Sequence, residues 1–208
     1  MRYEHKYVVE NFHAFEVEHL VRMHPAGFRK AFPDRQVNNI YFDTADFSTF
    51  QHNLMGISKR HKYRIRWYGN PIETVRNIRL ETKIKDNQLG RKEWEDREVE
   101  DWNSLINLIP NLNWTKELQL QPALLNAYQR AYYSTFNGKF RITVDHRLQF
   151  GPFNSSFPRL VHELPHKVIL ELKYDQALEH EADRITQYIP FRIDKHSKYV
   201  TGTSLIMY

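Results

Sequence analysis

The strongest constraint on the fold is a run of alternating charge between Arg60 and Trp67. Every second residue from Arg60 to Arg66 is cationic, and the intervening positions hold His, Tyr, Ile and Trp. Successive side chains of a β-strand point to opposite faces, so this segment predicts a strand with one purely basic face. Neighbouring like charges about 6.6 Å apart repel by ~2–3 kcal/mol at an effective dielectric near ~20, so the fold must offset this repulsion.

The same alternation of charged and uncharged residues recurs in segments 2–7, 79–85, 141–147 and 170–173. Any one such strand is typical of a half-buried sheet whose charged side faces water. For all of them together, two arrangements remain open. Either the sheet lies flat over helices and presents a large surface to a polyanion, or it closes with its charged faces inward and its apolar faces covered by helices.

Composition limits the chemistry that the chain can perform. The 208 residues include no Cys, which excludes disulfides, zinc–thiolate sites, iron–sulfur clusters and cysteine nucleophiles. The 30 Lys and Arg against 25 Asp and Glu give a net charge of +5, which weakly favours a polyanionic partner. No stretch approaches the ~18 apolar residues of a membrane span, so we expect a soluble protein with no membrane insertion. The absence of Cys fits a reducing, cytoplasmic environment. The sequence has no repeat, low-complexity block or linker, which predicts a single domain over residues 1–208.

Hydrophobic periodicity predicts mostly strands with a few short helices. We expect strands over residues 3–9, 37–42, 59–68, 76–85, 88–99, 139–150, 167–174 and 191–194. We expect helices from an N-cap at Asn11 to about His24, and over 46–54, 103–109, 122–134 and 175–188, with a last turn near the C-terminus. In the first helix, Phe12, Phe15 and Leu20 are interpreted as a core stripe. The excess of strands predicts an antiparallel sheet or a closed barrel with helices around it.

Seven short motifs then follow one another along essentially the whole chain. They are Arg2-x-Glu4-x-Lys6, Arg64-Ile65-Arg66-Trp67-Tyr68-Gly69, Leu80-Glu81-x-Lys83, Tyr128-x-Arg130, Arg141-Ile142-Thr143-Val144-Asp145, Leu170-Glu171-x-Lys173 and Lys195-x-x-Lys198-Tyr199-x-x-Gly202. Each alone is an ordinary strand pattern, whereas their order is specific. It resembles the order in the vacuolar transporter chaperone (VTC) domain, the polyphosphate-polymerase branch of the triphosphate tunnel metalloenzymes.

The resemblance implies an α+β fold: a closed, eight-stranded antiparallel β-barrel with peripheral helices, whose lumen binds triphosphate and growing polyphosphate. It implies a polymerase that adds the terminal phosphate of ATP to the chain, with Mn²⁺ or Mg²⁺ held by Glu171. The implied catalytic residues are Arg64, Arg66, Lys83, Arg130 and Glu171. The implied phosphate-binding residues are Lys6, Arg64, Arg66, Lys83, Arg130, Lys195 and Lys198, with Tyr128 as a hydroxyl donor and Arg60, Lys62, Arg141 and Lys173 as further cations.

The sequence departs from the family pattern at two positions that bear on the site. Arg2 stands where superfamily hydrolases carry their first acidic residue, which removes one metal carboxylate and argues against a second metal. Asn53 stands where the eukaryotic polymerases carry a basic residue, and Arg60 and Lys62 could supply that charge. We do not expect the coupled translocation of the eukaryotic proteins to carry over to this sequence, and a membrane-protein partner is left open.

Two other functions remain open. The Arg91-x-Glu93-x-Glu95 alternation also occurs in tunnel hydrolases and would suit a triphosphatase, although it equally fits a solvated strand edge. A non-catalytic binder of polyphosphate or nucleic acid could stack bases on Tyr63, Trp67 and Tyr68. Because these rings lie mostly opposite the cations, we expect them in the core and expect no nucleic acid as partner. The expected partners are ATP, triphosphate and polyphosphate.

Overall fold

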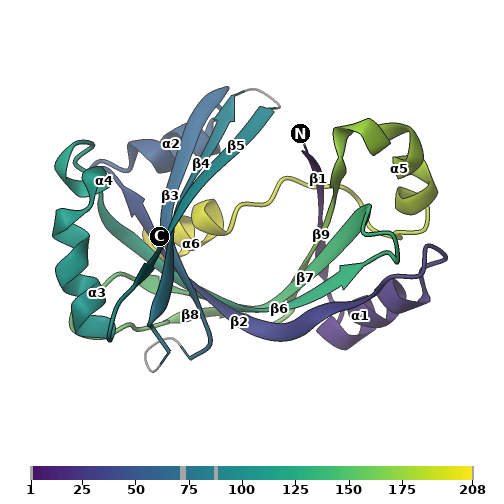
Figure 1. Cartoon of the computed structure of the whole chain (residues 1–208), viewed down its shortest axis with the longest axis horizontal. Helices are drawn as coiled ribbons and strands as arrows, with labels where there is room; N and C mark the ends of the chain where they lie inside the picture. Colours follow the sequence, from purple (N-terminus) through teal and green to yellow (C-terminus); the bar gives the residue numbers. More distant parts are fainter. Residues whose placement is uncertain (1, 71–73, 87–88, 208) are drawn as a thin grey trace. The chain divides into compact units, whose positions relative to one another are not determined.

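The computed structural model describes residues 2–70, 74–86 and 89–207 (Figure 1). Its strands are β1 (Arg2–Glu10), β2 (Arg29–Asp43), β3 (Lys59–Tyr68), β4 (Asn77–Asp86), β5 (Leu89–Glu98), β6 (Gln121–Ser134), β7 (Phe140–Pro152), β8 (His162–Leu164) and β9 (Lys167–Asp175). Its α-helices are α1 (Ala14–Met23), α2 (Ser48–Leu54), α3 (Trp102–Leu108), α4 (Asn113–Lys116), α5 (Glu179–Thr186) and α6 (Lys198–Met207). The 3₁₀-helices are η1 (Ile109–Asn111) and η2 (Gln176–Leu178).

The expected closed, eight-stranded barrel is wrong. The described strands form one nine-stranded antiparallel sheet in the order β1-β9-β7-β6-β2-β3-β4-β5, with β8 paired to β7. Within the described residues this sheet is open, and β1 and β5 are its end strands. The composition of β5 suits an edge, because exposed charged side chains occupy nearly every position from Arg91 to Glu98 on both of its faces. Charges on both faces keep an edge strand in water and discourage further pairing.

The chain divides into two compact units, which are described separately. Unit 1 contains residues 1–35, 128–148 and 164–196, and unit 2 contains residues 36–127, 149–163 and 197–208. Strands β2, β6, β7 and β8 each contribute residues to both units. The single domain expected over residues 1–208 stays a prediction.

In unit 1, the uncharged faces of β1, β6, β7 and β9 pack against α1 and α5 (Figure 1). The buried side chains include Tyr7, Ile142, Val144, Leu170 and Leu172. These are the residues that alternate with charges in the sequence, so the predicted strand phase is confirmed in this unit. Their burial leaves the charged positions of the same strands on the opposite face.

The apolar stripe expected in the first helix is wrong. Phe12, Phe15 and Leu20 are exposed to 41%, 68% and 38%, whereas α1 buries Val17 and Val21. Residues four apart lie on one face of a helix, and α1 begins only at Ala14, so Phe12 lies outside it.

In unit 2, the apolar faces of β2, β3 and β4 pack against α3 and η1. The buried side chains include Ile65, Trp67, Ile78 and Leu80, with Trp102 from α3. The predicted phase of β3 and β4 is therefore confirmed as well.

The aromatic residues of β3 serve mainly the core of unit 2. Trp67 is fully buried, and the Tyr63 ring packs edge-on against Trp114 at 5.5 Å between ring centres. Tyr68 differs, since 36% of it is exposed. Core packing of Tyr63 and Trp67, which was the expectation, is confirmed.

The helix expected over residues 122–134 is wrong, because this segment is strand β6. Ala131 and Tyr133 point into the core of unit 1, so Tyr128, Arg130 and Tyr132 belong to the other face. Leu, Ala and Gln favour a helix in isolation, and tertiary pairing with other strands outweighs that local preference. The short strand expected near 191–194 is reduced to a bridge between Tyr7 and Ile193.

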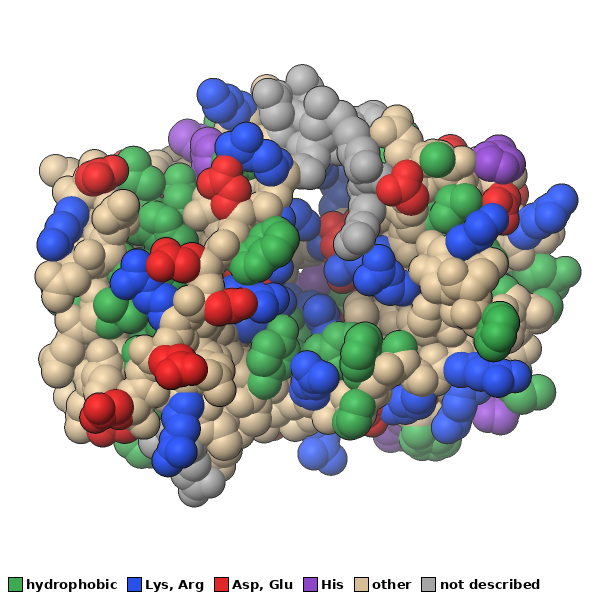
Figure 2. All heavy atoms as spheres, in the orientation of Figure 1, with side chains coloured by type: hydrophobic (Ala, Val, Ile, Leu, Met, Phe, Trp, Pro, Cys, Tyr) green, Lys and Arg blue, Asp and Glu red, His purple; other side chains and the backbone are tan. Residues whose placement is uncertain are grey.

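Charged side chains of both signs cover the face seen in Figure 2. The net charge alone therefore does not locate an anion site, and the strand faces have to be considered one by one. Within the described part of the chain, no helix is both long and apolar enough to cross a membrane.

Candidate functional site

The charged face of unit 1 brings acidic and basic residues of three strands into two rows. One row pairs Lys6 of β1 with Glu171 of β9, and Glu171 with Thr143 of β7. The next row pairs Glu4 with Lys173, and Lys173 with Arg141. Directly paired residues of antiparallel strands lie on the same face with adjacent Cβ atoms, so these side chains are neighbours.

Glu171 is the centre of this arrangement. Its side chain is only 8% exposed, and its two oxygens face Lys6 Nζ at 3.6 Å and Lys173 Nζ at 2.8 Å. Burial acts to raise the pKa of this carboxyl, but Lys173, a hydrogen bond with Glu4, and Lys6 hold the pKa well below its ordinary value. Glu171 is therefore a buried carboxylate that stays ionised at neutral pH.

Lysine contacts extend the cluster beyond Glu171. Lys173 Nζ also lies 3.4 Å from a carboxylate oxygen of Glu4, and Lys6 Nζ donates to the backbone oxygen of His196 at 3.1 Å. The Lys6 carbonyl accepts from the backbone N–H of Asp194 at 2.8 Å, which brings the segment containing Lys195 beside β1. Lys195 and Arg141 are exposed.

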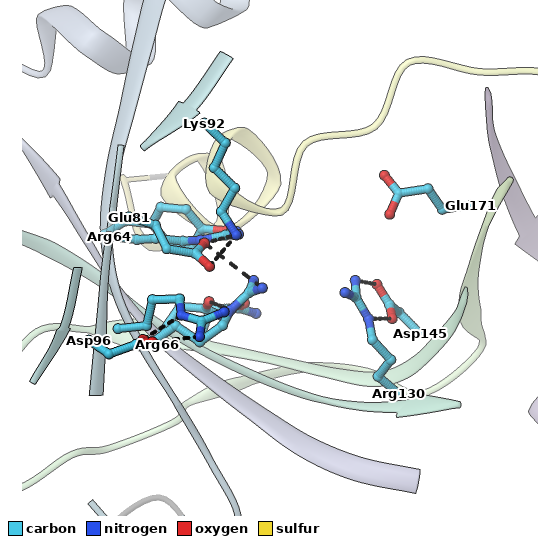
Figure 3. A network of polar contacts seen from close by, with 12 residues as sticks. Arg64, Arg66, Glu81, Lys92, Asp96, Arg130, Asp145 and Glu171 are labelled. Carbon is cyan, nitrogen blue, oxygen red and sulfur yellow. Dashed lines mark hydrogen bonds and ion pairs between the residues drawn. The ribbon is translucent and has the colours of Figure 1, made fainter. Parts of the chain in front are cut away.

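Arg130 of β6 is held by a carboxylate of the neighbouring strand β7. Its Nε and Nη2 donate to the two oxygens of Asp145 at 2.5 and 2.7 Å, and its side chain is 12% exposed (Figure 3). Burial works to lower the pKa of Arg130, and the charge of Asp145 more than reverses this. A bidentate pair fixes the plane of the guanidinium, so Arg130 is rigidly oriented. The guanidinium also lies over the Tyr128 ring, 5.2 Å from its centre.

The charged face of unit 2 has its own buried carboxylate, Glu81 of β4. Glu81 is 2% exposed, accepts from Arg64 Nε at 2.6 Å, and also binds Lys92 Nζ (Figure 3). Arg66 Nη1 lies 3.9 Å away. Burial acts to raise the pKa of Glu81, but Arg64, Arg66 and Lys92 lower it to about 2. Glu81 thus neutralises part of the basic face that the sequence of β3 predicted.

The arginines of β3 have further partners in unit 2. Arg64 Nη1 donates to the Tyr41 hydroxyl at 3.3 Å, and Arg66 Nε donates to Asn39 Oδ1 at 2.9 Å. Asn39 in turn donates to Asn126 at 3.1 Å. These bonds fix the two guanidinium groups before any ligand binds.

Three lysines stand side by side next to Glu81. Lys62 of β3 pairs with Lys83 of β4, and Lys83 pairs with Lys92 of β5. Lys62 Nζ donates to Ser197 Oγ at 2.8 Å. Burial lowers the pKa of Lys92 despite its contact with Glu81. A row of ammonium groups across adjacent strands is a natural place for an anion.

The remaining predicted positions are less closely involved. Arg60, the second residue of β3, donates from Nη1 to the carbonyl of Ile57 at 2.6 Å. Lys198 is the first residue of α6. Asn53, at the departure from the family pattern, bonds to backbone oxygens of Thr49 and His61. The side chain of Arg2, at the other departure, lies outside the described residues.

The structure therefore distributes the predicted site residues over both units. Unit 1 contains Lys6, Tyr128, Arg130, Arg141, Glu171, Lys173 and Lys195, and unit 2 contains Arg60, Lys62, Arg64, Arg66, Lys83 and Lys198.

The Arg91-x-Glu93-x-Glu95 motif does not join the Glu81 cluster. Glu93 and Glu95 pair in register with Thr82 and Leu80, so they lie on the opposite face of β5 from Lys92. Both are exposed, with ion pairs to Arg91 and Arg97. With Trp114 and neighbouring residues they line a pocket of about 240 Å³. The solvated strand edge, which was the preferred interpretation, fits these positions.

Sequence reasoning missed three residues that organise the clusters: Glu81, Lys92 and Asp145. Glu81 and Asp145 stand inside the quoted motifs and were given no function there. Glu81 occupies the same position in Leu80-Glu81-x-Lys83 that Glu171 occupies in Leu170-Glu171-x-Lys173. That repetition, on the charged phase of each strand, was the signal that could have revealed Glu81.

Comparison with known families identifies the chain. The family model of the VTC domain matches residues 1–207. The chain belongs to the VTC domain family. The resemblance to the VTC domain drawn from the seven motifs is thereby confirmed.

Solved structures similar to this VTC domain span nearly its whole length. A protein from Vibrio parahaemolyticus, provisionally named an adenylate cyclase, is 15% identical with a TM-score of 0.56, and 96% of this chain and 97% of that chain are covered. A protein of the same provisional name from Bacillus halodurans is 13% identical with a TM-score of 0.57, covering 94% and 93%. A Pyrococcus horikoshii protein is 14% identical with a TM-score of 0.52, covering 98% of each. These likenesses show the fold alone. Comparison with curated protein sequences found no match.

Proposed function

We propose that this VTC domain is a divalent-metal-dependent phosphotransferase that moves the terminal phosphate of ATP onto a polyphosphate chain. The observation that carries the proposal is the cluster on the charged face of unit 1. There the buried, ionised Glu171 lies between Lys6 and Lys173, and Arg130 is oriented in advance by Asp145. Four of these positions, Lys6, Arg130, Glu171 and Lys173, are ones that the family resemblance assigns to phosphate or metal.

The chemistry needs charge placed correctly more than it needs covalent help. Phosphoryl transfer passes through a loose transition state whose negative charge is spread over the oxygens of the transferred group. Fixed cations lower the energy of that state because they need not reorganise when the charge develops. Arg130 would bind phosphate oxygens from a fixed plane, and Lys6 and Lys173 would contribute mobile point charges.

The residues of the cluster fit a divalent metal. Mg²⁺ is commonly bound by one or two carboxylates together with substrate phosphates. Glu171 is ionised, and Glu4 is the second carboxylate at hand because Lys173 Nζ contacts both. These two residues would hold Mn²⁺ or Mg²⁺, with Lys173 moving aside onto phosphate. When bound, the ion would neutralise charge on the phosphate oxygens. The described residues include no group of three or more His, Asp or Glu arranged for a metal.

The charged face of unit 2 is proposed as a second phosphate-binding surface. Lys62 and Lys83 would contact phosphates directly, since they belong to the row of ammonium groups across β3, β4 and β5. Arg64 and Arg66 are oriented by Glu81 and Asn39 and would contribute positive charge in fixed positions. Arg60, Arg141, Lys195 and Lys198 would add positive potential.

A triphosphatase would use the same cations and differ only in its acceptor, which is water. In a triphosphatase the carboxylates of the Arg91-x-Glu93-x-Glu95 motif would orient that water, but Glu93 and Glu95 lie on the other face of β5 from Lys92. Their position favours the polymerase over the hydrolase.

The test is product analysis. The chain is incubated with ATP and MnCl₂, polyphosphate is measured on gels, and orthophosphate is measured in solution. We expect chains of polyphosphate from the wild type and none from Glu171→Gln. Glu10→Gln is the matched control, because Glu10 is an exposed carboxylate paired with Lys167 on the same two strands, and it should match the wild type.

Three outcomes would overturn the proposal. Orthophosphate alone would indicate a hydrolase, and binding of polyphosphate without turnover would indicate a non-catalytic domain. Full activity of Glu171→Gln would remove Glu171 from the reaction.

A further inference from the structure

Aromatic rings and guanidinium groups alternate from β6 to the first half of β2 in unit 1. The Arg130 guanidinium lies 5.2 Å from the centre of the Tyr128 ring and 6.0 Å from that of Tyr132. The Arg35 guanidinium lies 5.8 Å from the centre of the same Tyr132 ring and 5.6 Å from that of Phe32. The Phe32 and Tyr132 rings meet edge-on at 5.9 Å. We call these five residues the aromatic ladder.

The aromatic ladder runs from the proposed phosphate site to solvent. At its inner end Tyr128 is buried and Arg130 is bound to Asp145. At its outer end Phe32 is 55% exposed, on a stretch of β2 whose residues from Arg29 to Arg35 are all exposed. A single exposed Phe is common in proteins. Phe32 differs from such a residue because ring and guanidinium contacts connect it to Arg130 of the proposed active site. This connection favours a role in binding a ligand.

We propose that Phe32, Arg35 and Tyr132 form a subsite for the base of a nucleoside triphosphate whose phosphates lie at Arg130 and Glu171. The inference rests on the proposed function and adds to it the residues that would hold the base. Aromatic rings and guanidinium planes are the groups on which proteins stack unpaired bases. The Phe32 ring lies within about 12 Å of the Arg130 guanidinium, because each lies about 6 Å from the Tyr132 ring. Ribose and triphosphate can cover that separation.

The composition of the subsite also predicts its selectivity. Every base presents a π-face, so stacking tolerates any base. The aromatic ladder should therefore favour nucleoside triphosphates over inorganic triphosphate, and should accept GTP about as well as ATP. A subsite for phosphate at Arg35 would behave differently, because removal of the Phe32 ring would then have no effect.

The experiment compares substrates with and without a base. KM is measured for ATP, GTP and inorganic triphosphate, with MnCl₂, for the wild type, Phe32→Ala and Phe32→Trp. Phe136→Ala is the matched control, since Phe136 is 93% exposed in the same unit and makes no part of the aromatic ladder. We expect Phe32→Ala to raise KM for ATP and GTP by ~10-fold and to leave KM for inorganic triphosphate within ~2-fold. Phe32→Trp should keep KM near the wild-type values because it retains an aromatic ring, and Phe136→Ala should not change KM.

Two results would overturn the subsite: equal changes of KM for ATP and inorganic triphosphate, or no change for either. If the wild type turns over neither substrate, the proposed function fails on its own. The subsite is then tested by calorimetric binding of ATP and of inorganic triphosphate to the same variants. A loss of affinity confined to ATP would support it, and parallel or absent losses would exclude it.

Discussion

The same four-residue pattern builds two different charge clusters in this molecule. Leu80-Glu81-x-Lys83 in unit 2 and Leu170-Glu171-x-Lys173 in unit 1 both send their Leu into a helix-covered core and their Glu to the opposite, basic face. Both carboxylates are buried, and neighbouring cations lower the pKa of both. The clusters differ in the cations that strand pairing brings to each carboxylate.

Glu81 is paired with two arginines and Lys92, whereas Glu171 is paired with lysines. Arg64 and Arg66 are rigid forks, and the side chain of Arg66 is only 7% exposed. Lys6 and Lys173 are flexible point charges whose side chains are 26% and 34% exposed. Lysine can leave a carboxylate for water or phosphate more easily than a buried arginine can. Glu81 is thus suited to orienting arginines, and Glu171 to exchanging partners during a reaction.

The largest expected effect is on the stability of the fold, to which the two carboxylates should contribute very differently. Glu81→Gln should lower the free energy of unfolding by about 3 kcal/mol, because Arg64, Arg66 and Lys92 lose their shared charge partner and Arg66 is only 7% exposed. Glu171→Gln should lower it by less than about 1 kcal/mol, because its lysines can turn toward solvent. Urea unfolding of the wild type and both variants measures the difference. Equal losses would mean that the arginine and lysine clusters are energetically alike.

The pH dependence of stability sharpens the same comparison. The pKa of Glu81 is about 2 in the folded chain against an ordinary 4.5, so its contribution is present above pH 4.5 and is lost as the pH falls toward 2. At pH 3 the loss from this group should be about 2 kcal/mol. Between pH 7 and 3, the free energy of unfolding should therefore fall less steeply for Glu81→Gln than for the wild type. Parallel curves would show that Glu81 is not the group responsible.

Removal of one lysine tests whether the unit 1 cluster exchanges partners. Lys173→Met should lower kcat/KM for ATP about tenfold, which is about 1.4 kcal/mol of transition-state stabilisation, because one phosphate-binding charge is lost. The fold should persist, since the Lys173 side chain is partly exposed. Lys167→Met is the control, because Lys167 is on the same strand and pairs with exposed Glu10. An equal loss of activity in both variants would indicate a general effect of net charge.

The sequence predicts on which strand face each charged residue of these clusters lies, but it does not predict which residues it contacts. Alternation alone places Ile65 and Trp67 in the core and Arg64 and Arg66 opposite, because strand geometry has a period of two. That Arg64 stands beside Glu81 depends on the register of β3 against β4, which is a long-range property that no local pattern fixes.

The fold itself was only partly predictable for the same reason. The segment 122–134 has local helix preference and becomes a strand only through its neighbours. Whether the sheet closes depends on its end strands, β1 and β5, far apart in sequence. The charge on both faces of β5 is local information that favours an edge, and its importance became clear only with the sheet order.

The smallest expected effect on stability comes from an exposed ion pair of unit 2, which separates the contribution of burial from that of hydrogen-bond geometry. Arg79 donates two hydrogen bonds to Asp96, at 2.6 and 2.8 Å, so the geometry matches that of a strong bidentate pair. The side chains of Arg79 and Asp96 are 37% and 61% exposed, however, so water competes for both groups. Asp96→Asn should therefore leave the urea midpoint unchanged, although Arg79 lies only two residues from Glu81 on the same face of β4. A loss as large as that of Glu81→Gln would show that geometry, and not burial, determines the stability of these pairs.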